Sequence, residues 1–151
     1  MKIFSICFII ACLSFQFTNA QTNEYDSALA KKLNADGYGM KQYVLVLLKK
    51  GSVELTDKNV RDSVFHGHMA NIMRLAAEKK LILAGPTGEN DKNYEGIFVY
   101  NTADTTEARQ WLNTDPAIQS KELDAEIYPW YGPAALQQVI DINRKLQKKS
   151  F

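Results

Sequence analysis

The chain has 151 residues, with 18 basic and 17 acidic side chains and a formal net charge of +1. This length suits one domain with a full hydrophobic core. Because the charges balance, no basic excess points to a nucleic acid or an anionic membrane, and we expect neither as a partner.

The first twenty residues predict a secretory signal peptide. Lys2 precedes an apolar stretch over 3–17, and Thr18 and Ala20 occupy the two small-residue positions before the expected cut. The stretch is shorter than the roughly 20 residues that a membrane-spanning helix needs. We therefore expect an exported protein, periplasmic or secreted, with no stable membrane insertion after cleavage. Lipoprotein anchoring is the alternative, because the four residues that end at Cys12 loosely resemble a bacterial lipobox.

Both cysteines, Cys7 and Cys12, lie in the predicted signal peptide. Cleavage after Ala20 would leave 131 residues (151 − 20) with no thiol, no disulfide and no thiolate metal site. The mature protein would then depend on its hydrophobic core for stability.

The first half of the mature chain predicts a polar lead-in, a strand and a long helix. Residues 21–39 are polar, with one possible short helix. The run KQYVLVLLKK over 41–50 predicts a strand that is apolar on both faces, so both faces should be covered. A helix is predicted over 56–80, with Thr56 or Asp57 as its cap. Its apolar residues recur at helical spacing as one stripe that we expect to be buried, formed by Val60, Val64, Phe65, Met69, Ile72, Met73 and Ala76.

The second half predicts two more strands, a short helix and a last strand. Strands over 81–85 and 94–101 flank a loop over 87–93, and a helix over 103–114 follows, with Asp104 or Thr105 as its cap. Asp115-Pro116 begins a new segment, because proline disfavours helix at the residue before it. In the last strand, over 121–131, apolar Leu123, Ala125 and Ile127 alternate with acidic residues.

The order strand, helix, strand, strand, helix, strand is typical of an α+β ferredoxin-like βαββαβ fold. We predict a signal peptide over 1–20, a lead-in over 21–39, one ferredoxin-like domain over 40–132 and a C-terminal helix over 133–151. Both domain helices would pack on one face of the sheet. A second subunit packed sheet to sheet would cover the other face and make a homodimer, with the C-terminal helix as the competing cover.

The only two histidines lie in the long predicted helix. His68 lies four residues after Val64 and four before Ile72, on or beside the apolar stripe, as a half-buried structural histidine or as a functional one. His66 points to a different face and is expected at the surface. Two histidines at this spacing on a helix cannot bind one metal ion side by side, and no carboxylate cluster is local, so we expect no metal site.

Asp115 is the second candidate site residue. It precedes a proline just after a helix, where aspartate is often only a turn or cap residue. Alternatively it orients His68 and stabilises its charged form, which would make a general acid–base pair. Spacing alone leaves this open, because 47 residues separate the two.

No other catalytic signature stands out in the sequence. There is neither a G-x-S-x-G nucleophile motif nor a glycine-rich phosphate loop. Proton transfer without a cofactor, or binding without turnover, therefore remains, and we expect no cofactor. Tyr43, Phe98, Trp130 and Tyr131 could line a pocket for a small organic molecule, or belong to the core or a dimer interface.

From Lys41 to about Trp130 the chain resembles the YCII-domain family. The matching stretches are YVLVLLK, HMANIMRLAAEKKLILAGP, GIFVYN, EARQWLNTDP and EIYPW. A histidine 18 residues before the proline of a Gly-Pro strand end, combined with an Asp-Pro after the second helix, is fairly specific. The resemblance implies a ferredoxin-like domain in a dimeric α/β barrel, with a His–Asp pair in a cleft at His68 and Asp115.

The family resemblance also bears on function. Its members are thought to be enzymes, and one branch is associated with dechlorination of a hydroxylated aromatic ring. This chain departs from the common pattern because Phe65 stands where many members have an arginine, which argues against a shared anionic substrate, and because familiar members are cytoplasmic.

Two functions follow as hypotheses. The first is a small exported enzyme with His68 and Asp115 as its acid–base pair, acting on a small organic molecule such as a hydroxylated aromatic. The second is a non-catalytic dimeric module that binds a small ligand or an interaction partner. A pocket open to solvent beside His68 would favour the enzyme, and a histidine sealed under side chains would favour the module.

Overall fold

A computed structural model describes residues 24–149 of the chain. The predicted signal peptide and both of its cysteines lie outside the described residues, so export and lipid anchoring stay predictions. Within the described part, no helix combines the length and the apolar character that crossing a membrane requires.

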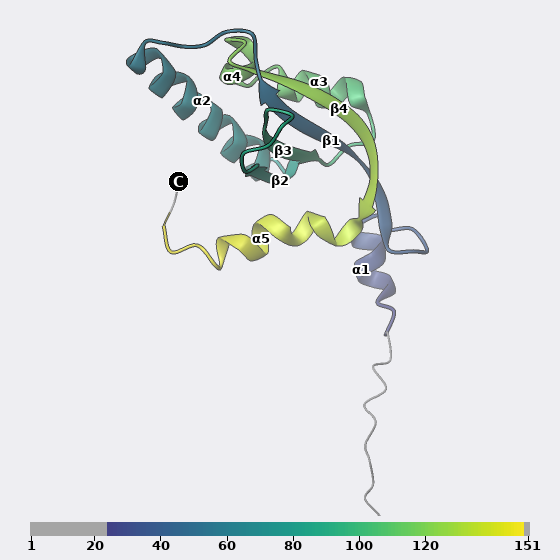
Figure 1. Cartoon of the computed structure of the whole chain (residues 1–151). Coiled ribbons are helices and arrows are strands. Elements are labelled where there is room, and N and C mark those ends of the chain that lie inside the picture. Colours follow the sequence, from purple (N-terminus) through teal and green to yellow (C-terminus); the bar gives the residue numbers. More distant parts are fainter. Residues whose placement is uncertain (1–23, 150–151) are drawn as a thin grey trace, which may run out of the picture.

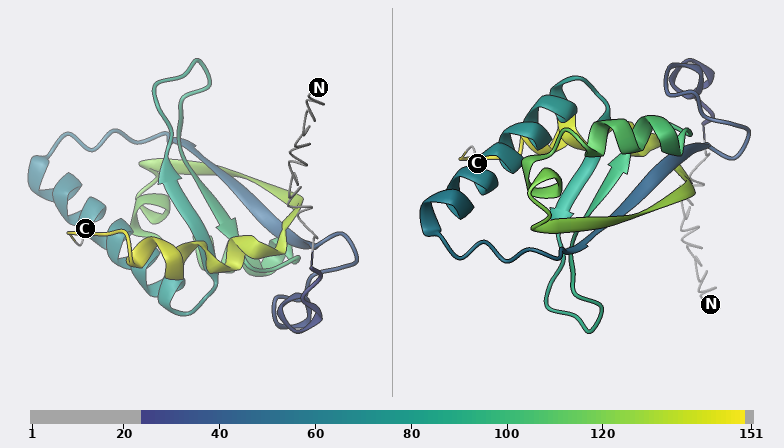
Figure 2. Two further views of the ribbon diagram at one scale, coloured as in Figure 1. Left: turned by 90° about the horizontal axis from the view of Figure 1, so that it is seen from below. Right: turned by 90° about the horizontal axis from the view of Figure 1, so that it is seen from above.

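Four antiparallel strands form one sheet in the order β2-β3-β1-β4 (Figure 1). The central strands are β1 (Met40–Lys50) and β3 (Tyr94–Tyr100), and the edge strands are β2 (Leu81–Pro86) and β4 (Leu123–Pro133). A hairpin that extends well beyond the sheet joins β2 to β3, where the loop over 87–93 was predicted (Figure 2).

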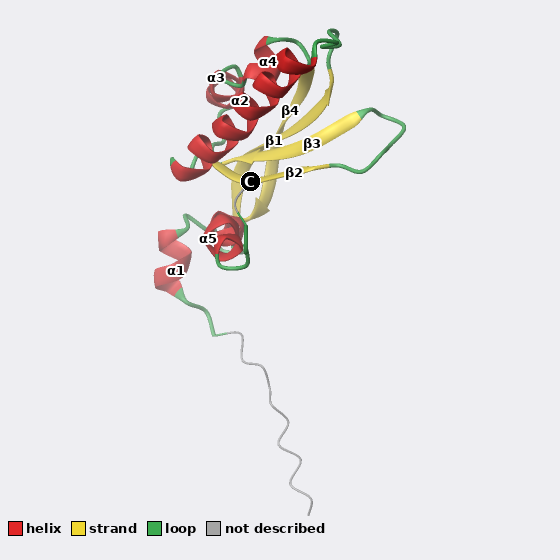
Figure 3. Ribbon diagram, turned by 90° about the vertical axis from the view of Figure 1, so that its left-hand side faces the viewer, coloured by secondary structure: helices red, strands yellow, loops and turns green. Residues whose placement is uncertain are grey.

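Three helices cover one face of this sheet (Figure 3). They are α2 (Lys58–Ala77), α3 (Thr105–Leu112) and α4 (Pro116–Gln119). The chain order β1-α2-β2-β3-α3-β4 and the strand order together make the ferredoxin-like α+β fold, so the predicted fold class is confirmed.

Short-range capping sets where these helices begin. The side chain of Asp57 accepts hydrogen bonds from the backbone N–H groups of Asn59 and Val60, and Asp104 accepts one from Thr106. Each carboxylate satisfies backbone donors that have no partner inside the helix. Both aspartates are among the caps that the sequence predicts.

The lead-in contains α1 (Ser27–Lys32), which matches the short helix considered for this segment. The chain then turns through Gly39, whose φ of +73° favours glycine, and enters β1. The amide of Gln137 donates to the carbonyl of Leu33 over 2.7 Å, which ties this segment to the C-terminal part of the chain.

The two faces of β1 contribute to two separate apolar clusters, as its sequence predicts. Val44, Val46 and Leu48 face the helices and pack with the main core under α2 and α3. Tyr43 is fully buried in a smaller cluster on the opposite face, with Leu45 partly buried beside it. The sheet therefore buries apolar side chains on both sides, although only one side carries the domain helices.

The apolar stripe of α2 behaves differently from its prediction. Val60, Phe65 and Met73 are 48%, 58% and 48% exposed, and the buried residues of α2 are Asn71 and Leu75. Much of the stripe lines an open cleft between α2 and the sheet, which leaves these side chains accessible to solvent. The expectation of one buried stripe was wrong for this reason.

The C-terminal segment also departs from the prediction of one continuous helix. A 3-10 helix, η1 (Ala134–Gln138), precedes the short α5 (Val139–Arg144), and Leu146 is 76% exposed. The hydroxyl of Tyr43 lies 3.2 Å and 3.3 Å from the carbonyl oxygens of Pro133 and Ala134, which holds the chain close to the sheet as it leaves β4. The α-helix begins only after this anchored turn.

The segment covers only part of the sheet's outer face. Leu136 of η1 packs against the smaller apolar cluster, while α5 runs beside the edge strand β2 (Figure 3). The C-terminal helix, which was considered as the alternative to a second subunit, therefore covers this face only in part.

Candidate active site

The fold brings the two predicted site residues into contact. His68 lies in the middle of α2, and Asp115 is the N-terminal cap of α4. Nδ1 of His68 is 2.7 Å from Oδ2 of Asp115. The Asp115 side chain is fully buried and the His68 side chain is 14% exposed. A buried carboxylate thus lies directly behind an imidazole that reaches solvent.

The hydrogen bonds of Asp115 determine which nitrogen of the His68 imidazole carries the proton. Oδ1 of Asp115 accepts from the backbone N–H of Ala117 at 2.9 Å, so only Oδ2 faces His68. An ionised carboxylate can only accept, so His68 donates its Nδ1–H and leaves Nε2 as the acceptor. The ring is stacked on Phe98, with centroids 6.0 Å apart. Nε2 is therefore the atom available for chemistry.

A glycine allows the two segments to meet. A Cβ atom at Gly67 would lie 2.8 Å from Cγ of Pro116, closer than side chains tolerate. Gly67 precedes His68 and Pro116 follows Asp115. The close packing of Gly67 and Pro116 therefore brings His68 and Asp115 together, and we call these two residues the dyad. Glycine inside a helix costs about 1 kcal/mol relative to alanine, which makes Gly67 a signal that sequence reasoning missed.

We expect Gly67→Ala to lower activity more than stability. The added methyl group would push the rigid ring of Pro116 away, and a displacement of about 1 Å at a catalytic group can cost about 10² in rate. Overpacking typically costs about 1–3 kcal/mol, offset by about 1 kcal/mol of helix propensity. Turnover and urea denaturation would measure both effects.

Gly88→Ala is the matched control, because nothing lies within 4 Å of its added Cβ. This variant should change neither the turnover nor the stability. Full activity in Gly67→Ala would show that the close approach does not position the dyad.

A polar network fastens α2 to the turn before α4. The guanidinium of Arg74 donates to Oδ1 of Asn71 at 2.7 Å and to the hydroxyl of Thr114 at 2.9 Å. The Thr114 hydroxyl lies 2.9 Å from the same Asn71 oxygen. Because Thr114 precedes Asp115, these bonds restrain the backbone that carries the carboxylate. None of these three residues was predicted from the sequence.

Tyr100 adds a buried phenol near this carboxylate. Burial raises the pKa of Tyr100 strongly, and the charge of Asp115 raises it further, while Arg74 acts in the opposite direction. Its hydroxyl has no hydrogen-bond partner among residues 24–149. Tyr100 therefore stays neutral at physiological pH, and no second negative charge forms beside Asp115.

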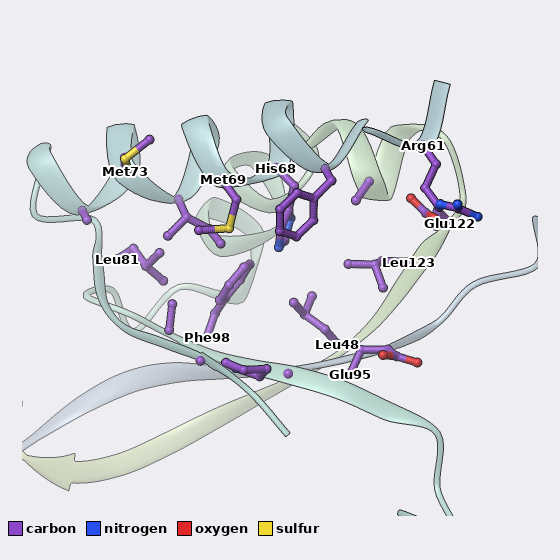
Figure 4. A pocket seen from close by; sticks show the side chains of 18 of the residues that line it. Leu48, Arg61, His68, Met69, Met73, Leu81, Glu95, Phe98, Glu122 and Leu123 are labelled. Carbon is purple, nitrogen blue, oxygen red and sulfur yellow. The ribbon is translucent and has the colours of Figure 1, made fainter. Parts of the chain in front are cut away.

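His68 lines an open cleft of about 1080 Å³ between α2 and the sheet (Figure 4). The middle of the cleft is apolar around the imidazole. Its apolar lining includes Leu48, Met69, Ile72, Leu81, Phe98 and Leu123. Arg61, Glu95 and Glu122 lie toward one end in Figure 4, and Arg144 lines the cleft from α5 (Val139–Arg144). This arrangement suits an organic molecule with one polar group directed at His68.

A model of the YCII-related domain matches residues 40–131. The chain belongs to the YCII-related domain family. The match spans all four strands except the last residues of β4, together with α2, α3 and α4. His68 and Asp115 both lie inside this YCII-related domain, whereas α1, η1 and α5 lie outside it.

The chain is similar to the solved structure of 5-chloro-2-hydroxyhydroquinone dehydrochlorinase (TftG) from Burkholderia phenoliruptrix AC1100, in complex with 2,5-dihydroxybenzoquinone. Sequence identity is 20%, the alignment covers 58% of this chain and 92% of that chain, and the TM-score is 0.41. No curated protein matches the chain.

Of the aromatic residues considered for the pocket of the YCII-related domain, Phe98 lines the cleft. Tyr43 and Trp130 lie opposite each other on the outer face of the sheet, with ring centroids 5.9 Å apart. Tyr131 donates a hydrogen bond to Asp36 near the lead-in. For these three residues the structure excludes the pocket, because strand alternation or position along β4 takes them away from the cleft. Tyr43 and Trp130 instead belong to the smaller apolar cluster, in line with the alternative considered for them.

His66 is exposed on α2, as its spacing from His68 predicts. Phe65, at the position where the family resemblance leads one to expect arginine, lines the cleft with an apolar ring. Between residues 24 and 149, no group of three or more histidine, cysteine, aspartate or glutamate residues could hold a metal ion.

Proposed function

We propose that this YCII-related protein is a small enzyme in which His68 is the general acid–base and Asp115 its orienting partner. The observation that carries the proposal is the 2.7 Å contact between a fully buried carboxylate and an imidazole that lines an open cleft. Export to the periplasm or the medium belongs to the same proposal and rests on the sequence of residues 1–20.

The dyad would move one proton in each direction. Nε2 of His68 takes a proton from a hydroxyl or acidic C–H group of the substrate, and the ring becomes an imidazolium. The carboxylate of Asp115 stabilises that positive charge through the Nδ1–H bond. The imidazolium then returns its proton to the product or to a leaving group. The apolar walls strengthen these charge interactions, because they exclude water.

The chemistry of the cleft points to a substrate with an apolar body and a weakly acidic hydroxyl group. Hydroxylated aromatics fit this description and include compounds of the class named for the dehydrochlorinase. Met69 and Ile72, which are partly exposed and line the cleft on the same helix as His68, offer an apolar surface for such a molecule.

A substrate screen tests the proposal. Hydroxylated aromatics, chlorinated and unchlorinated, and small organic acids would be screened by thermal shift against the wild type and His68→Gln. Each hit would then be assayed for turnover. A ligand that binds the folded protein raises its melting temperature by mass action. A compound that stabilises both proteins equally and is never converted would place the ligand away from His68 and contradict the assignment.

Binding without turnover is the second candidate function. The low exposure of the His68 side chain and the apolar walls favour it. In that case His68→Gln would lose stability, and the ligand affinity that survives would not be accompanied by conversion in either protein.

We also propose a homodimer that packs outer sheet face against outer sheet face. Leu45 lies opposite Val99 and Tyr128 on that face, and Tyr128 is 46% exposed. Burial of this apolar surface favours association. Sedimentation at micromolar concentration should show a dimer for the wild type and a monomer for Leu45→Glu.

Val60→Glu is the control for this experiment, since it adds the same charge at an exposed apolar residue on the helical side. It should remain dimeric. A wild-type monomer would contradict the proposed dimer.

A further inference from the structure

The C-terminal helix α5 forms part of the cleft although it lies outside the YCII-related domain. Ile140 and Arg144, one helical turn apart, both line the cleft that contains His68. Asn143 and Gln147 line it too. The site of this protein therefore includes a wall that the matched domain, which ends at residue 131, does not supply.

Contacts at its base hold this wall in place. Ala134 is buried, and Leu136 packs on the apolar cluster around Tyr43. The side chain of Gln137 lies 3.5 Å from Nζ of Lys41 and donates to the carbonyl of Leu33. The helix leaves this anchored turn and runs beside β2, across the cleft from the C-terminal half of α2 (Figure 1).

The dimensions of the cleft exceed the needs of a single aromatic ring. Its lining residues on α2 extend from Arg61 to Ala76, which at 1.5 Å per residue corresponds to roughly 22 Å of helix. Its volume of about 1080 Å³ lies slightly above the range of about 300–1,000 Å³ that is typical of pockets for drug-sized ligands. His68 lies between the charged end and the apolar part near Met73 (Figure 4).

We propose that α5 is a specificity wall and that Ile140 is its main apolar contact. It would select a ligand whose hydroxyl group reaches His68 and whose apolar body, larger than one ring, extends along Met73 toward α5. This inference rests on the proposed function, because both concern the same cleft. It adds the size class of ligand that the cleft selects, and it names Ile140 as a residue that makes this selection.

Phenol, 2-naphthol and 1-hydroxypyrene are probes of graded size that share one hydroxyl group. Their binding to the full mature chain would be measured by calorimetry or by probe fluorescence. Affinity for the wild type should rise with the number of rings. Ile140→Ala should weaken hydroxypyrene binding about fivefold, through lost apolar contact, and leave phenol binding unchanged.

Ile142→Ala is the matched control, because Ile142 lies on the same helix, is 54% exposed and does not line the cleft. It should bind all three probes like the wild type. Ile140→Trp is a second variant, whose larger side chain would narrow the cleft and again weaken hydroxypyrene more than phenol. Circular dichroism would verify that each variant is folded.

The proposal is overturned if Ile140→Ala leaves hydroxypyrene binding unchanged, weakens all probes equally, or behaves like Ile142→Ala. Its failure can be told apart from failure of the catalytic proposal. Size-dependent binding that needs Ile140, without conversion of any compound, would support the wall and reject the enzyme. Conversion of a compound that needs His68, together with hydroxypyrene affinity that is unchanged in Ile140→Ala, would support the enzyme and reject the wall.

Discussion

His68→Gln should lower kcat/KM by about 10² to 10⁴ while the protein stays folded, because that is the usual contribution of a general acid–base. Glutamine keeps roughly the size of histidine and can still hydrogen-bond to Asp115, but it cannot take and return a proton. Steady-state kinetics on a substrate found in the screen would measure the loss, and thermal unfolding would measure the stability.

His66→Gln is the matched control for this experiment. It makes the same change two residues away, at an exposed position that does not line the cleft. Activity should stay at the wild-type level. Equal activity in His68→Gln and the wild type would reject the catalytic role of the imidazole.

Two substitutions of Asp115 should separate its catalytic role from its structural one. Asp115→Ala removes the cap of α4 and leaves the Nδ1–H of His68 without its acceptor in a partly buried position. Loss of a cap costs about 1 kcal/mol, and an unsatisfied buried donor costs about 1–3 kcal/mol. We therefore expect the free energy of unfolding to fall by about 2–4 kcal/mol, measured by urea denaturation.

Asp115→Asn should instead keep most of the stability and lose activity. The amide oxygen can still cap α4, but the amide N–H₂ would then face Nδ1 of His68. The imidazole would have to accept at Nδ1 and carry its proton on Nε2, so it could no longer act as a base toward the cleft. A loss of kcat of about 10² or more is expected. Wild-type kcat in this variant would show that the tautomer of His68 is irrelevant.

Asp104→Ala provides the control for the capping contribution. Asp104 caps α3 through the same type of bond, 2.7 Å from the N–H of Thr106, but it has no histidine partner and is exposed. Its replacement should cost about 1 kcal/mol and leave turnover unchanged. The additional loss in Asp115→Ala then measures what contact with His68 contributes.

Local patterns in the sequence determined most of the fold. The alternation of β1 predicted that Tyr43 and Val44 would enter clusters on opposite faces, because successive side chains of a strand point to opposite sides. Asp57 and Asp104 predicted the starts of two helices, because a cap acts on backbone groups two or three residues away. The order of these elements was then enough to predict the ferredoxin-like topology.

The same patterns gave wrong predictions where the structure depended on contacts and distances between secondary-structure elements. Helical spacing predicted a buried stripe on α2, yet Phe65 and Met73 line a cleft, because periodicity gives the direction of a side chain and not the distance to the next layer. Helical spacing beyond Gly132 likewise predicted one long helix, but anchoring of the chain by Tyr43 at the end of β4 produced a 3-10 turn first.

For the candidate site, too, the sequence predicted one part and the tertiary structure determined the rest. The sequence by itself offered His68 and Asp115 as candidates, each with a structural alternative, and suggested their pairing only through a family resemblance. The tertiary structure decided that His68 and Asp115 meet although they are 47 residues apart in the sequence, because the missing side chain of Gly67 lets Pro116 pack against α2. It also placed His68 in the lining of an open cleft to which residues of α5 contribute. These features depend on contacts between distant segments, which local residue patterns do not encode.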